Sequence, residues 1–153
     1  MIKLLNPIMN FIMQGDREKL PIVKDLASVR LALESVIYVH DRCDWTQKPE
    51  LTWGIKKGDC EDFAHLAMKL LDGINIFSGV LSVICKDKRI SHAVCLFMLN
   101  GKYSYFSNSK LIMTDTDDIK KVVFRLGGNQ VRNWKLINIK GELLNRGGSI
   151  NET

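Results

Sequence analysis

The sequence lacks several features that define whole classes of protein. No stretch approaches the roughly 20 consecutive apolar residues that a membrane-spanning helix needs. None of the four cysteines forms a CxxC pair, and no cluster of cysteine and histidine has the spacing of a structural zinc site. There is no internal repeat, no low-complexity tract and no long linker. These absences argue against a membrane protein, a zinc module and a repeat protein, and they favour a single domain of 153 residues.

The basic residues are not concentrated in one place. The net charge is +5, and the lysines and arginines are scattered along the chain. The densest basic run, KDKR at residues 86–89, has no aromatic residue within it. That composition is typical of a solvated turn rather than of a nucleic-acid-binding surface. We therefore expect neither a nucleic acid nor a membrane as a partner.

The N-terminal residues 1–15 are rich in apolar side chains, but Asn6, Pro7 and Asn10 interrupt the run. No small-residue cleavage motif follows, so the segment is predicted to be an amphipathic helix that docks on the domain rather than a signal peptide. Cys85 and Cys95 fall in predicted strands as small core residues, so a reducing compartment is the simpler assumption. These features predict a cytoplasmic protein and suggest a phage or mobile-element source.

The spacing of apolar residues predicts helices first and strands afterwards. Helical spacing extends over residues 22–40 and 60–72, where Gly73 ends the second helix, and the intervening residues 41–57 are loop-like. Two-residue periodicity then predicts strands at 80–86, 91–99, 102–108 and 134–139, with a short helix at 115–126. The order indicates an α+β fold, with one domain over residues 1–146 and a frayed polar tail over 147–153.

One cysteine stands where a loop becomes a helix. Cys60 follows Asp59 and precedes Glu61 and Asp62. The unpaired N–H groups at a helix start favour an anion, so this position lowers the pKa of a thiol. Asp59 and Asp62 have the three-residue spacing of a helix cap, whereas capping gives Glu61 no role. The alternative is a buried structural cysteine at the end of a core helix.

A nucleophilic thiol needs a base, and the three histidines differ in position. His65 lies about 140° around the helix from Cys60 and cannot easily turn towards the thiol. His40 ends the first predicted helix, where it suits the negative end of the helix dipole. His92 begins a hydrophobic strand directly after a polar turn, where a side chain can stand above a cleft. His92 is therefore the candidate base.

A base also needs a third group that orients its ring, and the hairpin register decides which residue that is. A two-residue turn at Asn100 and Gly101 pairs His92 with Ser109, whereas a three-residue loop pairs it with Asn108. The sequence leaves both registers open.

These residues match the pattern of a known family. The segments WGIKKGDCEDFAHLAMKLL (53–71) and SHAVCLF (91–97) resemble the transglutaminase-like cysteine proteinase superfamily, and they are most similar to its bacterial cysteine proteinases. DWTQKPE (44–50) resembles that branch's W-x-x-P-x-E pattern, with one extra residue after Trp45. The resemblance covers about residues 35–109. It implies a papain- or transglutaminase-like core, in which a central helix carrying the cysteine packs on an antiparallel sheet.

The resemblance also implies a set of catalytic roles. Cys60 is the expected nucleophile, His92 the base and Asn108 the third residue. The family commonly has Asp at the position of Ser107, so Ser107 is the alternative third residue. The backbone N–H of Cys60 and the indole N–H of Trp45 are the expected oxyanion donors.

The implied chemistry is cleavage of an amide bond in a protein substrate through a thioester. One alternative is acyl transfer to or deamidation of a protein glutamine, and another is a catalytically degenerate binding module of the same fold. A periplasmic branch of the family binds calcium through acids that match Asp59, Glu61 and Asp62, so calcium is an alternative to the expectation of no cofactor.

Overall fold

The computed structural model describes residues 19–40 and 45–151. Within these residues the helices are α2 (Leu26–Glu34), α3 (Pro49–Ile55), α4 (Cys60–Asp72) and α5 (Ile119–Gly127), with short 3₁₀ turns η1 (Lys88–Ile90) and η2 (Gly128–Gln130). The strands are β1 (Ile37–Tyr38), β2 (Lys57–Gly58), β3 (Ser78–Cys85), β4 (His92–Leu99), β5 (Lys102–Ser107), β6 (Lys110–Met113), β7 (Val131–Ile137) and β8 (Leu143–Gly147).

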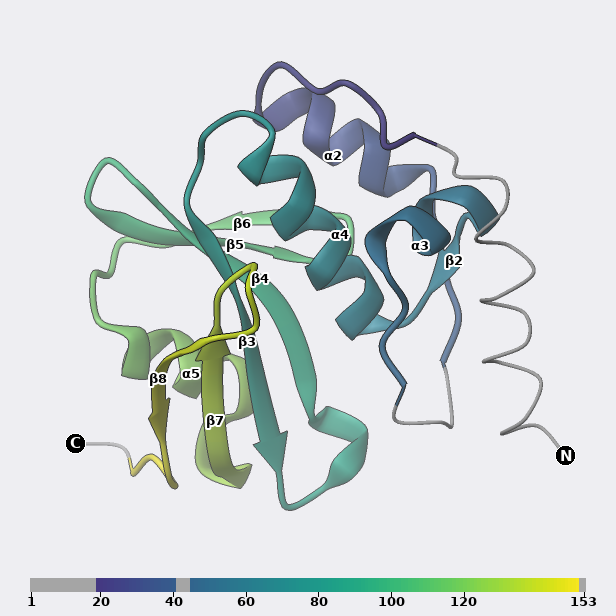
Figure 1. Cartoon of the computed structure of the whole chain (residues 1–153). Helices are drawn as coiled ribbons and strands as arrows, with labels where there is room; N and C mark the ends of the chain where they lie inside the picture. The colour runs from purple at the N-terminus through teal and green to yellow at the C-terminus, as the bar shows by residue number, and fades with distance from the viewer. Residues whose placement is uncertain (1–18, 41–44, 152–153) are drawn as a thin grey trace, which may run out of the picture.

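A six-stranded antiparallel sheet forms the centre of the molecule. Its order is β6-β5-β4-β3-β7-β8, and β1 pairs separately with β2 in parallel. Helix α4 packs on β3 and β4, with α2 and α3 against it, whereas α5 packs on β3 and β7 (Figure 1). The fold is α+β, with a central helix packed on an antiparallel sheet, as the sequence predicts.

Alternate residues of the strands build two separate cores. Val80, Ala93 and Cys95 face α4 and join a cluster that includes the buried side chains of α2 and α4. Leu81 and Val94, one residue further along their strands, join a second cluster with the buried residues of α5. The two-residue period of a strand produces this division, because successive side chains point to opposite faces of the sheet.

The central elements agree closely with the predictions. Helix α4 begins at Cys60 and ends at Asp72, with Gly73 as its C-cap. Strands β4 and β5 are joined by a two-residue turn, since Leu99 pairs with Lys102. Cys85 and Cys95 are fully buried free thiols, which confirms their predicted place in the core.

The first predicted helix is wrong in its length. Helix α2 covers only Leu26–Glu34, because the chain then pairs Ile37 and Tyr38 with Lys57 and Gly58 to form β1 and β2. The predicted loop at 41–57 contains α3, with Pro49 as its first residue, a position that proline tolerates well in a helix.

The C-terminal prediction is also wrong in part. Strand β7 is followed by β8, and residues 147–151 are not simply a frayed tail. Gly147 ends β8 directly against the indole of Trp134, and the partly buried Ile150 packs against the second core. The apolar side chain of Ile150 and the missing side chain of Gly147 explain this packing. Residues 152–153 and the predicted N-terminal helix at 1–15 lie outside the described residues.

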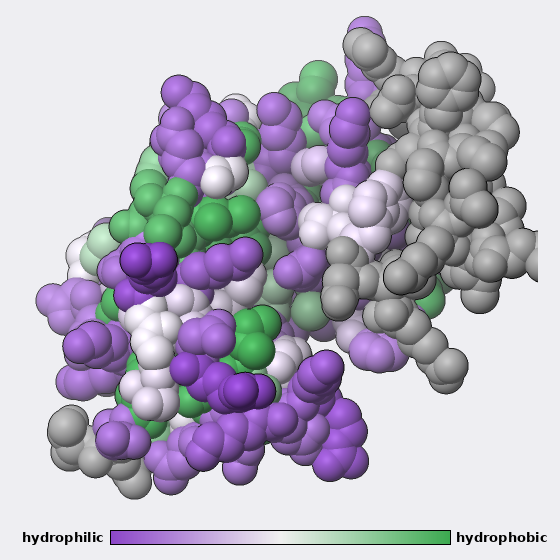
Figure 2. Space-filling view, turned by 60° about the horizontal axis from the view of Figure 1, so that its bottom comes forward, coloured by the Kyte–Doolittle hydropathy of each residue, from purple (hydrophilic) through white to green (hydrophobic). Residues whose placement is uncertain are grey.

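The surface is mostly polar. Hydrophilic residues cover most of the face drawn in Figure 2, where apolar side chains appear in small patches. No helix in the part of the chain that the structure describes has the length and apolar character needed to cross a membrane.

Gly58 determines how closely the chain before Cys60 approaches α4. A Cβ at this position would lie 2.6 Å from Asp62 Cβ and 3.1 Å from Thr52 Cγ2, and both residues are fully buried. We expect Gly58→Ala to lower the free energy of unfolding by about 1–3 kcal/mol, because the added methyl group overpacks this contact. Urea denaturation measures the effect.

Gly148→Ala is the matched control, because a Cβ there meets nothing within 4 Å. Equal free energies of unfolding for the two variants would contradict the inference that close packing at Gly58 contributes to stability.

Candidate active site

The start of α4 is held by reciprocal hydrogen bonds between two carboxylates and the backbone. The N–H of Asp62 donates to Asp59 Oδ1 at 3.1 Å, and the N–H of Asp59 donates to Asp62 Oδ2 at 3.0 Å. This arrangement is a capping box, and it confirms the predicted capping roles of both acids. Cys60 is therefore the first residue of the helix, where its own N–H has no acceptor within the helix.

The same carboxylates fix the loop that precedes α3. The N–H of Gln47 donates to Asp62 Oδ1 at 2.7 Å, and the hydroxyl of Thr46 donates to Glu61 Oε2 at 2.7 Å. Asp62 is 0% exposed, so its charge is stabilised entirely by protein groups. The contact with Thr46 gives Glu61 the structural role that capping did not supply.

Cys60 and His92 line one cleft of about 850 Å³ at the start of α4. The backbone N–H of Ala93, the residue after His92, forms a hydrogen bond with the sulfur of Cys60, and this bond counters part of the rise in the pKa of the thiol. The two residues predicted as nucleophile and base thus open into the same space. The other residues that line this cleft are Tyr38, His40, Thr46, Asp59, Glu61, Ser82, Val83, Ile84, Lys88, Arg89, Ile90, Ser91, Ala93, Leu126 and Lys135.

Ser107 is the residue that contacts the histidine ring. Its Oγ lies 2.8 Å from Nε2 of His92. Because that nitrogen is engaged, Nδ1 is the ring atom left for a thiol. The two-residue turn between β4 and β5 excludes the register that would place Asn108 opposite His92.

Asn108 lies instead in the turn to β6, with a positive φ of 51°. Its buried Oδ1 has no hydrogen-bond partner within the described residues. The structure therefore places Cys60 and His92 in one cleft and pairs the His92 ring with Ser107 rather than with Asn108.

The pKa values of the thiol and the ring shift in opposite directions. Burial raises the pKa of the Cys60 thiol, and the charges of Asp59 and Glu61 raise it further, while the N–H groups of Ala93 and Glu61 oppose them. Burial lowers the pKa of His92. The helix start was expected to lower the pKa of the thiol, but burial has the larger effect. Removing the thiolate from water destabilises it by more than the helix N–H groups stabilise it. Both groups are neutral near pH 7.

The remaining predicted residues lie around the site. Trp45 is partly buried in the loop that Glu61 and Asp62 hold, but it does not line the cleft. His65 is partly buried in α4, where burial lowers its pKa. His40 lines the cleft rather than ending a helix, because α2 stops earlier in the chain.

Tyr38 is a cleft residue that the sequence did not reveal. It pairs with Gly58 in the two-stranded parallel sheet, which places it beside the start of α4. Burial raises the pKa of its phenol, and the charges of Cys60 and Asp59 add to that shift. A two-residue strand has no periodicity, so only the pairing across the fold could identify Tyr38.

The three acids around Cys60 do not fit a calcium site as a set. Both oxygens of Asp62 already accept backbone N–H groups, and Glu61 Oε2 accepts the hydroxyl of Thr46. Across residues 19–40 and 45–151, no group of three or more His, Cys, Asp or Glu side chains is arranged to hold a metal.

The comparisons with known proteins agree with this geometry. A family model described as a transglutaminase-like domain matches residues 14–133. The chain belongs to this family. No curated protein matches the sequence.

Solved structures with a similar fold include LapG from Legionella pneumophila. One LapG structure shares 16% identity with a TM-score of 0.50, and the match covers 76% of this chain and 68% of LapG. A calcium-bound form shares 17% identity with a TM-score of 0.50, covering 81% of this chain and 70% of that one. An EGTA-treated form shares 16% identity with a TM-score of 0.50, covering 72% and 63% respectively. At this identity the similarity shows the fold alone.

Asp62 should be the most sensitive carboxylate for stability. Asp62→Asn replaces one acceptor oxygen with an NH₂ group that cannot accept a backbone N–H. We expect a loss of about 2–3 kcal/mol in the free energy of unfolding, because a buried N–H is left without an acceptor. Chemical denaturation measures it.

Asp72→Asn removes the same charge from the exposed end of α4, and we expect a change within about 0.5 kcal/mol. Equal effects of the two variants would contradict the anchoring role of Asp62.

Proposed function

We propose that this transglutaminase-like domain is a cysteine hydrolase that cleaves an amide bond in a protein substrate. The activity we propose first is that of a peptidase. The supporting observation is the cleft that Cys60 and His92 both line, together with the contact of Ser107 with the His92 ring. Family membership supports the same reading, because the match covers residues 14–133 and so includes Cys60 and His92, the residues to which the sequence resemblance gives the roles of nucleophile and base.

The proposed reaction begins with both groups neutral. His92 Nδ1 accepts the thiol proton as the sulfur of Cys60 attacks the substrate carbonyl carbon, which forms a tetrahedral oxyanion. The low pKa of His92 suits this step, because the ring is present as the neutral base. The imidazolium then gives its proton to the leaving amine, and a thioester remains on Cys60. Water attacks the thioester, His92 takes one of its protons, and the acid and the thiol are released.

The proposed oxyanion donor is the backbone N–H of Cys60, which is free of helix bonding at the first position of α4. Trp45, the second donor that the sequence resemblance implies, does not line the cleft. No step of the proposed reaction uses a metal ion.

A non-catalytic binding module is the second candidate, and Ser107 favours it. Ser107 occupies the position where the family commonly has Asp, and a neutral hydroxyl stabilises an imidazolium less than a carboxylate does. The labelling experiment below separates the two candidates.

Native alkylation tests the nucleophile. We expect iodoacetamide to label Cys60 far faster than the buried Cys85 and Cys95, and we expect His92→Ala to slow labelling of Cys60 by about tenfold, because the base is lost. Mass spectrometry gives the rate at each cysteine. Labelling of Cys60 that is indifferent to His92→Ala would support the binding module instead.

The pH dependence of the same labelling tests the charge state of the pair. Because the pKa of Cys60 is raised from 9.0 and that of His92 is lowered, the thiolate forms only as the pH rises above about 9. We expect the rate to increase continuously from about pH 6 to about pH 10. A flat rate between about pH 6 and about pH 8 would reveal a preformed thiolate–imidazolium pair and contradict this assignment.

Ser107 can be tested against Asn108 as the orienting residue. We expect Ser107→Asp to raise the pKa of His92 and to increase kcat about tenfold, and Ser107→Ala to lower kcat by a similar factor. Asn108→Gly keeps the positive φ and removes the amide, and we expect a smaller effect from it.

Hydrolysis of a protein substrate and an NMR titration of the ring measure these changes. Ser149→Asp is the charge control, because it adds the same charge at an exposed position that does not line the cleft. A larger loss of kcat from Asn108→Gly than from Ser107→Ala would indicate that Asn108, rather than Ser107, is the third residue.

A further inference from the structure

A row of four side chains crosses the sheet from the catalytic end of the cleft towards its outer edge. Ala93 pairs with Ser82, Ser82 pairs with Lys135, and Lys135 pairs with Arg146. Directly paired residues on neighbouring strands share a face, and Ala93 belongs to the core on the α4 side. The row therefore lies on that face and consists of two small residues followed by two cationic ones.

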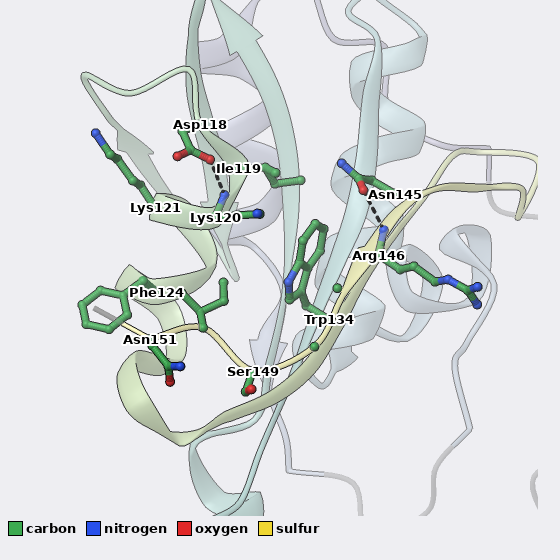
Figure 3. Close-up of a pocket in the computed structure, with 13 residues that line it drawn as sticks. Asp118, Ile119, Lys120, Lys121, Phe124, Trp134, Asn145, Arg146, Ser149 and Asn151 are labelled. Atoms are coloured by element: carbon green, nitrogen blue, oxygen red, sulfur yellow. Dashed lines mark hydrogen bonds between the residues drawn. The ribbon is translucent and has the colours of Figure 1, made fainter. Parts of the chain in front are cut away.

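The two cations are open to a partner. Lys135 lines the cleft, and it also lines an adjoining pocket together with Arg146. Both side chains are exposed. Figure 3 shows the Arg146 side chain extending away from Trp134, on the other side of β8. Within residues 19–40 and 45–151 the ion pairs are Arg30–Glu34 and Arg89–Asp87, so neither Lys135 nor Arg146 has a carboxylate partner there.

The other end of the cleft carries the opposite charge. Asp59 and Glu61 flank Cys60 and line the same space. Across the sheet the charged residue that lines the cleft is Lys135, whereas Lys88 and Arg89, which is ion-paired with Asp87, line it on the segment before His92. Ala93 and Ser82 precede Lys135 in the row across the sheet, and both line the cleft with small side chains.

We propose that this cleft binds an extended peptide segment with an acidic side chain several residues from the scissile bond, held by Lys135 and Arg146. The proposal rests on the proposed hydrolase function and names its substrate class.

Strand spacing sets the position of the acidic residue. Neighbouring strands lie about 4.8 Å apart, so Lys135 is about 10 Å and Arg146 about 14 Å from Ala93 across the sheet. An extended peptide advances about 3.3 Å per residue. The acidic side chain therefore lies about three or four residues from the bond that Cys60 attacks. Asp59 and Glu61 disfavour an acidic residue directly beside that bond.

Cleavage of a mixed peptide pool tests the specificity. A chymotryptic digest of total bacterial protein is incubated with the wild-type chain, and the new peptide ends are read by mass spectrometry. We expect Asp and Glu to be enriched three or four residues from the cut on one side only. Lys135→Glu with Arg146→Glu should abolish this enrichment, whereas Lys102→Glu, at the far end of the β4–β5 hairpin, should preserve it. Cleavage without acidic enrichment would overturn the proposal and leave the hydrolase function intact.

Peptide binding tests the groove without any chemistry. In a Cys60→Ser background, fluorescence anisotropy compares a labelled Ala/Gly-based peptide carrying a Glu pair with the same peptide carrying a Gln pair. We expect the Glu peptide to bind about tenfold more tightly at low salt, and Lys135→Glu with Arg146→Glu to remove the difference. Lys135→Gln with Arg146→Gln provides a milder pair if charge reversal impairs folding.

Equal binding of the two peptides, or an equal effect of Lys102→Glu, would overturn the proposal. Absence of any cleavage together with unselective labelling of Cys60 would instead contradict the hydrolase function, and the anisotropy comparison would still decide the ligand class of the groove.

Discussion

The buried carboxylate of Asp62 is the interaction on which the geometry of the site depends. It accepts the N–H of Asp59 within the capping box and the N–H of Gln47 from the preceding loop. One side chain thereby defines the first residue of α4 and fixes the segment that passes beside it. Because the carboxylate is enclosed, its charge requires both donors, and the loop and helix start are held as one unit. This arrangement sets the position of Cys60.

The acids around Cys60 therefore have two effects on the site. They build the helix start that presents the thiol, and they also raise the pKa of that thiol together with burial. The lowered pKa of His92 complements this state, because a neutral ring can take the proton that the thiol retains. The partner of the ring, Ser107, is uncharged, so the ring gains orientation from it but little electrostatic support.

The parts of the site that follow local rules could be predicted from the sequence. Asp59, Cys60 and Asp62 obey helix-capping spacing, and His92 begins a strand marked by clear alternation. The third residue could not be predicted, because one residue of difference in the hairpin turn exchanges the candidates opposite His92. Only the observed turn, together with the contact from Ser107, decides between the registers.

Elements that depend on long-range pairing were also missed. Strand β1 is two residues long and exists because it meets β2, so Tyr38 gave no local signal. Strand β8 (LLNRG) shows no two-residue alternation of apolar and polar side chains, and its place beside β7 depends on Gly147 fitting against Trp134. In both places the decisive term is packing between distant segments rather than propensity or periodicity.

Because side chains alternate along β3 and β7, the two faces of these strands have different roles. Ser82 and Lys135 face the α4 side, whereas their neighbours Leu81, Val83 and Trp134 pack in the core beneath α5. Substitutions at the first set alter what the sheet presents to a partner, and substitutions at the second alter whether the sheet holds α5. Related domains can therefore diverge in what they recognise while keeping one scaffold, since each change is confined to one face of a shared strand.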